Sequence, residues 1–456
     1  MGLIVVMLSV RGVFGSSTCV VSAKRRAVKA GATATFAAVL IGVSMPSAAQ
    51  TYGPEDIENA SRAPIDQPDL PQPLLDAVEV SLSQNPQVLA GLAELAALNS
   101  DLRGAKWQRF PNLSAEILAT TGGSNAADVD GLAVNLALEQ PIWTAGRINN
   151  SIEVARTSRN IGRTALREIR FDILLAITNS YYEALLAFER VEALETGLAE
   201  MRLLAQSIER RVAREVSPAA DLRLARSRLT QLEVEITSAR EIGENAMLRL
   251  EELVGGPVPK PVFPEHNLTL GLPVQEVGLR EAMSCSPLLE RLRGEIDLAD
   301  AQRKVTRSGL FPQLLVQLSQ NELTGARAAL ALRWQTGNGL SQLAATRSAE
   351  ARVERAIALL GQADQEMRRL TSSEYVALRS SQRREEAGQM ALDAATELLA
   401  SYRRQFVAGR RSWLDVMNAA REKTFAAVSY RDARVSVAGS ATRILALSCN
   451  WRPQGI

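Results

Sequence analysis

The chain has 456 residues and a formal net charge of +2, and only 4% of its residues are aromatic. The first 49 residues contain five basic and no acidic side chains, so the rest holds 47 basic against 50 acidic side chains, a net charge of −3. This balance excludes a nucleic-acid-binding protein, which needs a basic face, and the low aromatic content favours long packed helices over an aromatic-rich globule.

The N-terminus has the pattern of a secretory signal peptide over residues 1–49. Basic residues precede an apolar stretch at 32–43, and small residues at 47–49 form a cleavage site. The first twenty residues are atypical in front of such a signal, which favours a translation start near Val20 or Val21. We therefore expect an exported protein. No later stretch is apolar enough to predict a membrane-spanning helix.

Residues 50–256 predict a short helix, a β-hairpin and two longer helices. The first helix is expected to continue past Pro86 and to end before Pro111, because proline disfavours helix in the residue that precedes it. Apolar and polar residues then alternate over 112–140, which predicts a hairpin with one apolar and one polar face. We expect Pro141 to end this hairpin.

The longest pattern follows the hairpin. Apolar residues repeat every seven positions through 148–254, with a turn near Pro218, which predicts two antiparallel helices that need partner helices along their length. The longer of these two helices, which precedes the turn, would be roughly 95 Å long at a rise of 1.5 Å per residue. This length excludes an ordinary globular core and indicates a rod or the wall of a tube. The helix that follows the turn, here called the return helix, and the short helix before the hairpin together match the long helix in length. We therefore expect these two helices to stack end to end beside the long helix.

The second half of the chain repeats the order of the first. Pro287 lies 201 residues after Pro86, and Pro312 lies 201 residues after Pro111. Each proline again stands at the corresponding boundary of a predicted helix. The sequence therefore predicts an internal duplication with a period near 200 residues and not a short solenoid repeat.

The second copy is expected over 279–450, with its hairpin at 312–338, followed by a long helix and a return helix. A linker at 257–278, which contains several prolines and follows two glycines, joins the two copies. Residues 451–456 form a short tail. By the same length argument, the linker falls partway along the predicted rod, where it would form part of a belt.

The four predicted strands are each about eight to ten residues long and have one apolar face. In an exported protein, this pattern is typical of the strands of outer-membrane barrels. Four strands cannot close a barrel, and open sheet edges are not tolerated in lipid. We therefore expect several copies to pool their strands, and their long helices to continue the barrel as a tube.

The order of short motifs resembles the TolC family of outer-membrane efflux and secretion channels over the whole mature chain. The motifs are Asn-Pro at 85–86, Phe-Pro at 110–111, the stretch 140–147, and 406–409 followed by 414–416. The resemblance implies a mainly α homotrimer with a minor β part. Its twelve strands would form one outer-membrane barrel, continued by a periplasmic α-helical tunnel with an equatorial belt. It also implies docking to a periplasmic adaptor (membrane fusion protein) and an inner-membrane pump of RND or ABC type.

The resemblance further implies a gate at the periplasmic mouth of the tunnel. Asp415 matches an acidic position that projects into the closed entrance, and Asn418 stands where many members have a second acid. Arg411 matches a basic residue that ties one coiled coil to its neighbour, and Asp221 matches its acidic partner. Two alternatives remain open. The two aspartates also fit first-turn acids stabilised by a helix dipole, and Arg411 also fits a solvated surface charge.

The turn of the second repeat resembles the adaptor-docking turn of the family, which would be made here by Val407, Ala408, Gly409 and Arg410. In the first repeat, the glycine position of this turn is occupied by Glu215, with Ser217 close behind it. We include Glu215 and Ser217 among the candidate docking residues, although this departure from the family pattern counts against docking through the first turn.

Two further sets of residues have two interpretations each. Cys285 and Cys449 both fall near the predicted belt, where an oxidising periplasm would allow a disulfide, and two separate buried thiols fit the sequence equally well. Trp107, Trp143 and Trp334 fall near strand ends. They fit anchors at the membrane interface, and they also fit core packing beneath the barrel.

Nothing in the sequence predicts enzyme chemistry. The single histidine is His266 in the linker, and no metal cluster, cofactor motif or activated nucleophile is recognisable. We therefore predict a channel in the outer membrane, with most of the chain in the periplasm, that contacts lipid and no nucleic acid. One alternative is a channel for secretion of adhesins or toxins in place of small-molecule efflux. Another is a periplasmic coiled-coil adaptor or structural rod, which would not need two matched β-hairpins.

Overall fold

The computed structural model describes residues 70–120, 131–321, 325–335 and 339–453, all within one structural unit, Ala63–Ile456. The predicted signal peptide lies outside the described residues. The first half of the described chain contains α1 (Gln72–Gln84), α2 (Pro86–Trp107), β1 (Asn112–Thr120), β2 (Gly131–Trp143), α3 (Arg147–Ala213) and α4 (Ala219–Val254). The second half contains η2 (Leu268–Gly271), α5 (Gln275–Cys285), α6 (Pro287–Ser308), β3 (Gln313–Asn321), β4 (Gly325–Arg333), α7 (Ser341–Val407) and α8 (Trp413–Leu447).

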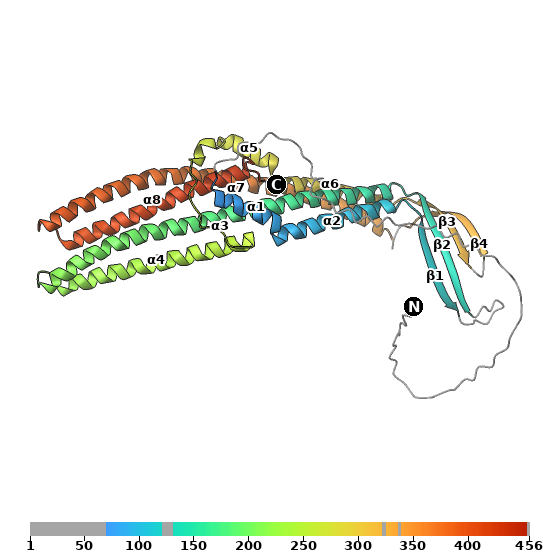
Figure 1. Ribbon diagram of the computed structural model, residues 1–456. Helices are drawn as coiled ribbons and strands as arrows, with labels where there is room; N and C mark the ends of the chain where they lie inside the picture. The colour runs from blue at the N-terminus through green and yellow to red at the C-terminus, as the bar shows by residue number, and fades with distance from the viewer. Residues whose placement is uncertain (1–69, 121–130, 322–324, 336–338, 454–456) are drawn as a thin grey trace, which may run out of the picture. The chain divides into compact units, whose positions relative to one another are not determined.

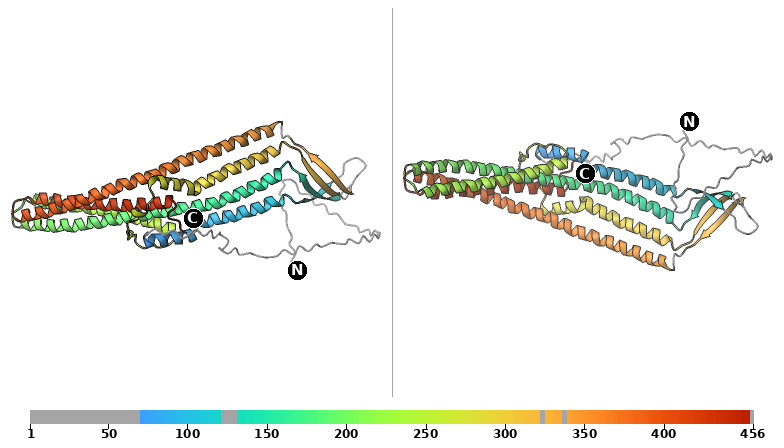
Figure 2. Two further views of the ribbon diagram at one scale, coloured as in Figure 1. Left: turned by 90° about the horizontal axis from the view of Figure 1, so that it is seen from above. Right: turned by 90° about the horizontal axis from the view of Figure 1, so that it is seen from below.

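The two halves have the same order of elements, which confirms the predicted duplication. In each half, two short helices precede a β-hairpin, and a helix of 67 residues and a shorter return helix follow it. The turns of the two helical hairpins lie at one end of this unit and the strands at the opposite end (Figure 1). The return helix α4 and the short helix α2 pack on different stretches of α3, as their lengths predict (Figures 1 and 2).

The first helix does not continue past Pro86, so this part of the sequence prediction is wrong. Asn85 is extended, with φ −62° and ψ 130°, and separates α1 from α2. Proline excludes helical geometry in the preceding residue, and Asn85 instead caps α2 by accepting a hydrogen bond from the N–H of Gln87 at 2.9 Å. The side-chain amide of Asn85 also donates to Leu253 O at the end of α4. Ser286 and Pro287 make the same break between α5 and α6.

The four strands form one antiparallel sheet in the order β1-β2-β3-β4. The hairpins pair Leu113 with Leu138 and Leu314 with Leu332, so the alternating apolar residues of all four strands share one face. Strands β1 and β4 are the edges of this sheet within the chain. An unpaired edge presents backbone groups that another strand can satisfy.

Strand β2 does not end at Pro141 as predicted. It continues to Trp143, with an irregularity in its pairing to β3 between Pro141 and Trp143. Proline lacks an N–H and is accommodated in sheets at such irregular positions. The side-chain amide of Gln140 lies across this segment and donates to Arg109 O at 3.1 Å and to Pro141 O at 2.9 Å.

The largest buried cluster lies where the two repeats meet. Its fully buried side chains include Leu74, Ile177, Tyr181 and Ile444. The Tyr181 hydroxyl donates to Val262 O and accepts from Val262 N–H, both at 2.9 Å, and so fixes the linker against α3. Burial raises the pKa of Tyr181 to about 12, so the phenol stays neutral and keeps its donor at physiological pH.

Candidate functional site

The two turns that end the helical hairpins have the same backbone geometry. Glu215 and Gly409 both adopt the left-handed conformation, with φ of 62° and 72°. Val216 N–H donates to Arg211 O and Arg410 N–H donates to Gln405 O, each at 2.9 Å, which is the pattern of a Schellman motif. Equivalent residues are 194 positions apart. Glu215 therefore reproduces the glycine turn of the second repeat, although a side chain in this conformation costs about 1–2 kcal/mol.

Three of the predicted gate residues surround the second turn. Arg411 Nη1 lies 3.6 Å from Asp415 Oδ2, and Arg411 Nε donates to Gln405 Oε1 at 3.2 Å. The Arg411 guanidinium also stacks 4.3 Å above the ring of Tyr402. Asn418 follows one turn later and is exposed. Stacking and the two polar contacts hold Arg411 in one orientation.

Asp221 occupies the position in the first repeat that Asp415 has in the second. Both lie in the first turn of a return helix. Asp221 N–H donates to Pro218 O, whereas Asp415 N–H donates to the Ser412 hydroxyl at 3.2 Å. Among the described residues, the carboxylate partner of Arg411 is Asp415, and no ion pair joins Arg411 to Asp221.

Four of the predicted docking residues lie at the second turn. All four of them are exposed, namely Val407, Ala408, Gly409 and Arg410. Val407 has 87% of its surface accessible, and Val216 in the first turn is 60% accessible. Ser217 is half-buried and accepts a hydrogen bond from Arg211 Nε at 3.4 Å.

The two helical hairpins are joined near these turns by contacts that sequence reasoning missed. The Arg211 guanidinium lies 5.1 Å from the ring centre of Phe406. Farther along α3, the Glu200 carboxylate receives Arg403 Nη2 at 3.0 Å and Lys423 Nζ at 3.2 Å, so it connects α3 to both α7 and α8. These residues are about 200 positions apart, and no local pattern could have paired them.

A second group of ion pairs joins α3 to α8 closer to the middle of the helices. Arg431 contacts Glu189 at 3.0 Å and Glu192 at 3.1 Å, and Arg190 pairs with Asp432. The Arg431 guanidinium lowers the pKa of Glu192 through a hydrogen bond and through its charge. With the Glu200 contacts, this group fixes the second hairpin against the first.

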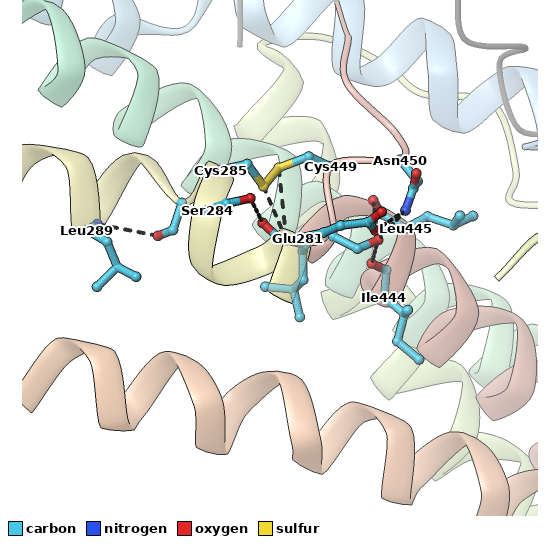
Figure 3. Close-up of a disulfide and its surroundings, with 11 residues drawn as sticks. Glu281, Ser284, Cys285, Leu289, Ile444, Leu445, Cys449 and Asn450 are labelled. Atoms are coloured by element: carbon cyan, nitrogen blue, oxygen red, sulfur yellow. Dashed lines mark hydrogen bonds between the residues drawn. A yellow bond between two sulfur atoms is a disulfide. The ribbon is translucent and has the colours of Figure 1, made fainter. Parts of the chain in front are cut away.

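The two cysteines among the described residues form a disulfide. The bond joins Cys285, the last residue of α5, to Cys449, which follows α8 (Figure 3). The adjacent Asn450 donates its side-chain amide to Glu281 Oε2 on α5 at 2.9 Å. The beginning and the end of the second repeat are therefore joined at the level of the linker. Sequence reasoning left this pairing open, because the distance between the cysteines depends on the helix packing.

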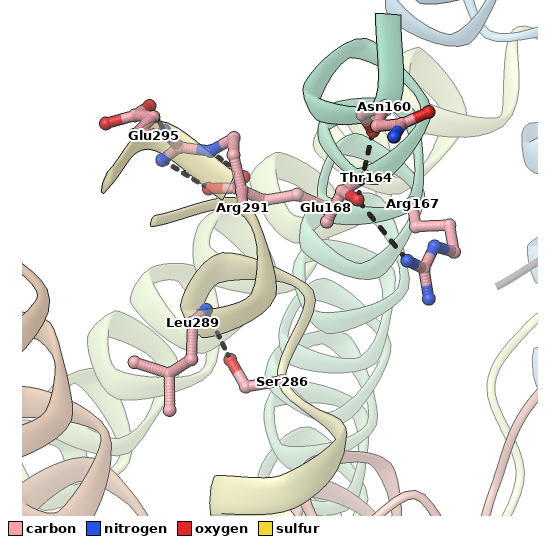
Figure 4. Close-up of polar contacts among 8 residues, drawn as sticks. All are labelled: Asn160, Thr164, Arg167, Glu168, Ser286, Leu289, Arg291 and Glu295. Carbon is pink, nitrogen blue, oxygen red and sulfur yellow. Dashed lines mark hydrogen bonds and ion pairs between the residues drawn. The ribbon is translucent and has the colours of Figure 1, made fainter. Parts of the chain in front are cut away.

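Beside the disulfide, α6 is fixed to α3 by a shared arginine. Arg291 pairs with Glu168 of α3 and with Glu295 of its own helix (Figure 4). The hydrogen bond to Glu168 is the main cause that raises the pKa of Arg291. At the start of the same helix, the Ser286 hydroxyl accepts from Leu289 N–H at 3.4 Å. This cluster holds the first and second repeats together on the strand side of the disulfide.

The sheet presents an apolar and a polar face. Leu113, Ile117, Leu330 and Leu332 lie on the apolar face, and each exposes about two thirds of its surface. On the polar face, Arg333 contacts both carboxylate oxygens of Glu139 at 3.2 Å, and Gln317 Nε2 donates to the same carboxylate at 3.0 Å. An exposed apolar face and a satisfied polar face fit a strand set with lipid on one side and a lumen on the other.

The three tryptophans lie where the helices meet the strands. Trp107, Trp143 and Trp334 are 68%, 49% and 63% exposed, so none of them packs in a core of the single chain. Trp334 Nε1 donates to Leu310 O at 3.1 Å. A ring with an apolar body and a satisfied polar tip suits the boundary between lipid and water.

The described part of the chain offers no metal site built from three or more His, Cys, Asp or Glu side chains. Across the same residues, none of the helices combines the length and the apolar character that crossing a membrane requires.

Comparison with known proteins gives a family. The family model described as outer membrane efflux protein matches residues 77–256 and 278–448, one match in each structural repeat. The cobalt-zinc-cadmium resistance protein CzcC of Cupriavidus metallidurans is 27% identical over 195 residues, which are 42% of this chain and 46% of that protein. The chain thus matches about half the length of CzcC. The alkaline protease secretion protein AprF of Pseudomonas aeruginosa is 25% identical over 386 residues, 76% of this chain and 78% of AprF.

The fold is also that of solved channel structures. The structure of CusC, a protein studied for the formation of a transmembrane channel, has a TM-score of 0.74 to this chain. The similarity covers 85% of this chain and 94% of CusC, at 16% sequence identity. The family and the fold are those of channel proteins.

Proposed function

The chain belongs to the outer membrane efflux protein family, and from this premise we propose that three copies form one channel through the outer membrane. The observation that carries the proposal is the four-stranded sheet, with its exposed apolar face and two unpaired edges, β1 and β4. In a ring of three copies, β4 of each copy would pair with β1 of the next copy. The ring then has twelve strands and no unpaired edge. This closure is what lipid requires of a sheet.

The long helices continue this barrel into the periplasm. Two helical hairpins per copy would give the wall of a tunnel, with the two turns at its periplasmic mouth. A periplasmic adaptor and an inner-membrane pump would meet the channel there and pass substrate into it. In this proposal the substrate moves through the bore without chemical change, as the description of the family as efflux proteins suggests.

The two relatives suggest two substrate classes. CzcC is named for resistance to cobalt, zinc and cadmium, and AprF for secretion of alkaline protease. The match to AprF extends over 386 residues, against 195 for CzcC. This extent favours protein secretion as the second candidate function beside efflux of small solutes.

The gate proposal places Asp415 in a ring of three carboxylates at the periplasmic mouth. We expect the mature protein to conduct ions in planar bilayers and to be blocked by hexaamminecobalt(III) added at the periplasmic side. Asp415→Ala should weaken this block by about tenfold or more, because the ring loses all three negative charges and a loss of 1.4 kcal/mol corresponds to tenfold.

Asp101→Ala is the matched control, because Asp101 is an exposed acid on α2, on the strand side of the chain. It should leave the block unchanged. Unchanged block of Asp415→Ala would remove Asp415 from the gate, and absence of any conductance would overturn the channel itself.

A further inference from the structure

The two tip turns concentrate positive charge in a chain that is otherwise acidic. Residues 209–223 and 403–417 together hold eight arginines and four carboxylates, a net charge of +4. Residues 50–456 as a whole carry −3, so the remainder outside these two segments carries −7. In a trimer the tip segments would bring a charge of +12 to one end of the assembly. A field of this size steers the approach of an acidic partner.

Four of the eight arginines are available to a partner. Arg211, Arg403 and Arg411 are occupied within the chain by the contacts described above. Arg223 lies on α4, behind the turn. The remaining four are exposed, and the structure gives them no ion pair to any described residue; they are Arg210, Arg214, Arg404 and Arg410.

Helix stability explains only part of this set. Arg210 and Arg404 are equivalent residues in the last turns of α3 and α7, where a cation interacts favourably with the helix dipole. Arg214 is the C-cap residue of α3, and Arg410 lies two residues beyond the C-cap of α7, in the turn itself. The second turn therefore carries an exposed guanidinium that no helix terminus requires.

Exposed apolar side chains accompany these arginines. Val216 follows Arg214 by two residues in the first turn, and Val407 precedes Arg410 by three in the second. Val407 at 87% exposure is the more accessible of the two. Arginine beside accessible apolar surface is the composition typical of protein interfaces, whereas a solvated tip would not need the valines.

The surface is also held in a fixed shape before any partner arrives. Both turns are closed by the same backbone hydrogen bonds, and the Arg211–Phe406 contact connects one turn to the other. Binding to a fixed surface loses less conformational entropy than binding to a mobile loop.

We propose that this surface binds a periplasmic protein whose docking end presents carboxylates around apolar side chains. We name it the tip surface and define it by Arg210, Arg214, Val216, Arg404, Val407 and Arg410. The inference rests on the proposed function, which provides for a periplasmic partner at the tip, and it adds the chemistry of that partner. A partner with a basic docking end would be repelled.

The test uses two designed antiparallel helical hairpins as probes. They are identical except at the turn, where one carries three glutamates around a leucine and the other three lysines around the same leucine. Binding of each hairpin to the complete mature protein, which is purified in detergent, is measured by surface plasmon resonance at 50 and 300 mM NaCl. We expect the glutamate hairpin to bind at least about tenfold more tightly than the lysine hairpin, and to bind more weakly at the higher salt.

Two matched variants locate the binding surface. Serine substitution of the four available tip arginines should weaken binding of the glutamate hairpin by at least about tenfold. The control variant carries serine at four arginines of α7 that are exposed and lie away from its tip end, Arg347, Arg352, Arg355 and Arg383. It removes the same charge and should leave binding within about twofold of the unchanged protein.

Three results would overturn the inference. They are equal binding of both hairpins, equal loss in both variants, and binding of phosphatidylglycerol vesicles through the same arginines without binding of the glutamate hairpin. Conductance of each preparation is measured in parallel. A conducting trimer without preference for the glutamate hairpin removes only the partner chemistry, whereas a protein that neither trimerises nor conducts removes the proposed function as well.

Discussion

Removal of the disulfide between Cys285 and Cys449 should lower the free energy of unfolding by about 2–4 kcal/mol. The bond spans 164 residues and joins the start of the second repeat to its end. A cross-link over such a long stretch restricts the unfolded chain strongly, and the segment it fixes packs against the main buried cluster. The measurement is thermal and urea unfolding of the detergent-solubilised protein with both cysteines replaced by serine.

Reduction of the unchanged protein provides the control. Dithiothreitol should lower its melting temperature toward that of the double serine variant and should have no effect on that variant. Mass mapping without reduction should find Cys285 and Cys449 in one linked peptide pair. Two free thiols in protein isolated from the outer membrane would contradict the disulfide.

Replacement of Gly197 by alanine should lower the free energy of unfolding by about 1–3 kcal/mol. Gly197 lies in α3 where it meets α8, and a Cβ added there would come within 2.3 Å of Thr424 Oγ1 and 2.4 Å of Thr424 Cγ2. Thr424 is buried and its hydroxyl donates to Ala420 O, so it cannot rotate away without losing that bond. The two hairpins must then separate, which also strains the neighbouring Glu200 ion pairs. Unfolding in urea measures the effect.

A second glycine on a long helix gives the matched control. Among the described residues, nothing outside the adjoining part of α7 lies within 4 Å of a Cβ added at Gly361, so Gly361→Ala should stabilise the protein by about 0.5–1 kcal/mol through helix propensity. Thr424→Ala should recover a large part of the loss when combined with Gly197→Ala. If Gly197→Ala behaved like Gly361→Ala, the close contact between α3 and α8 would be absent from the assembled protein.

Much of the fold could be predicted because its elements are long and strongly periodic. The two antiparallel helices expected over 148–254, with a turn near Pro218, are α3 and α4, since glycine, proline and polar residues mark their ends. The apolar face of the sheet could be predicted from the alternation of apolar and polar residues along each strand. Leu113 in β1 and Leu332 in β4 lie on the same face as the apolar residues of β2 and β3. These signals are local in sequence.

The errors have local causes as well. The break at Asn85 was missed because the apolar pattern continues across it, although the rule that proline disfavours helix before it applies there as it does at Phe110. Pro141 was expected to end β2, but a strand accommodates proline where its pairing is irregular. Docking through the Glu215 turn stays a separate question, and the structure adds that its backbone takes the same conformation as the Gly409 turn.

The contacts between the two hairpins could not be predicted from the sequence. Glu200 and Lys423 belong to different repeats, and their pairing depends on the angle and offset at which α3 packs on α8. The orientation of Arg411 toward Asp415 has the same origin, since it also depends on the ring of Tyr402, which lies on α7 before the turn. The residue types along a long helix predict which of its faces is apolar. The ion-pair partner of each charged side chain depends on how the helices pack.

The central claim is that each chain supplies four strands of a barrel that only three copies can close. Native mass spectrometry of the mature protein released from detergent micelles tests it most directly. The account predicts a complex of three chains that loses solubility when detergent is removed. A single chain that stays dissolved in water without detergent would contradict it.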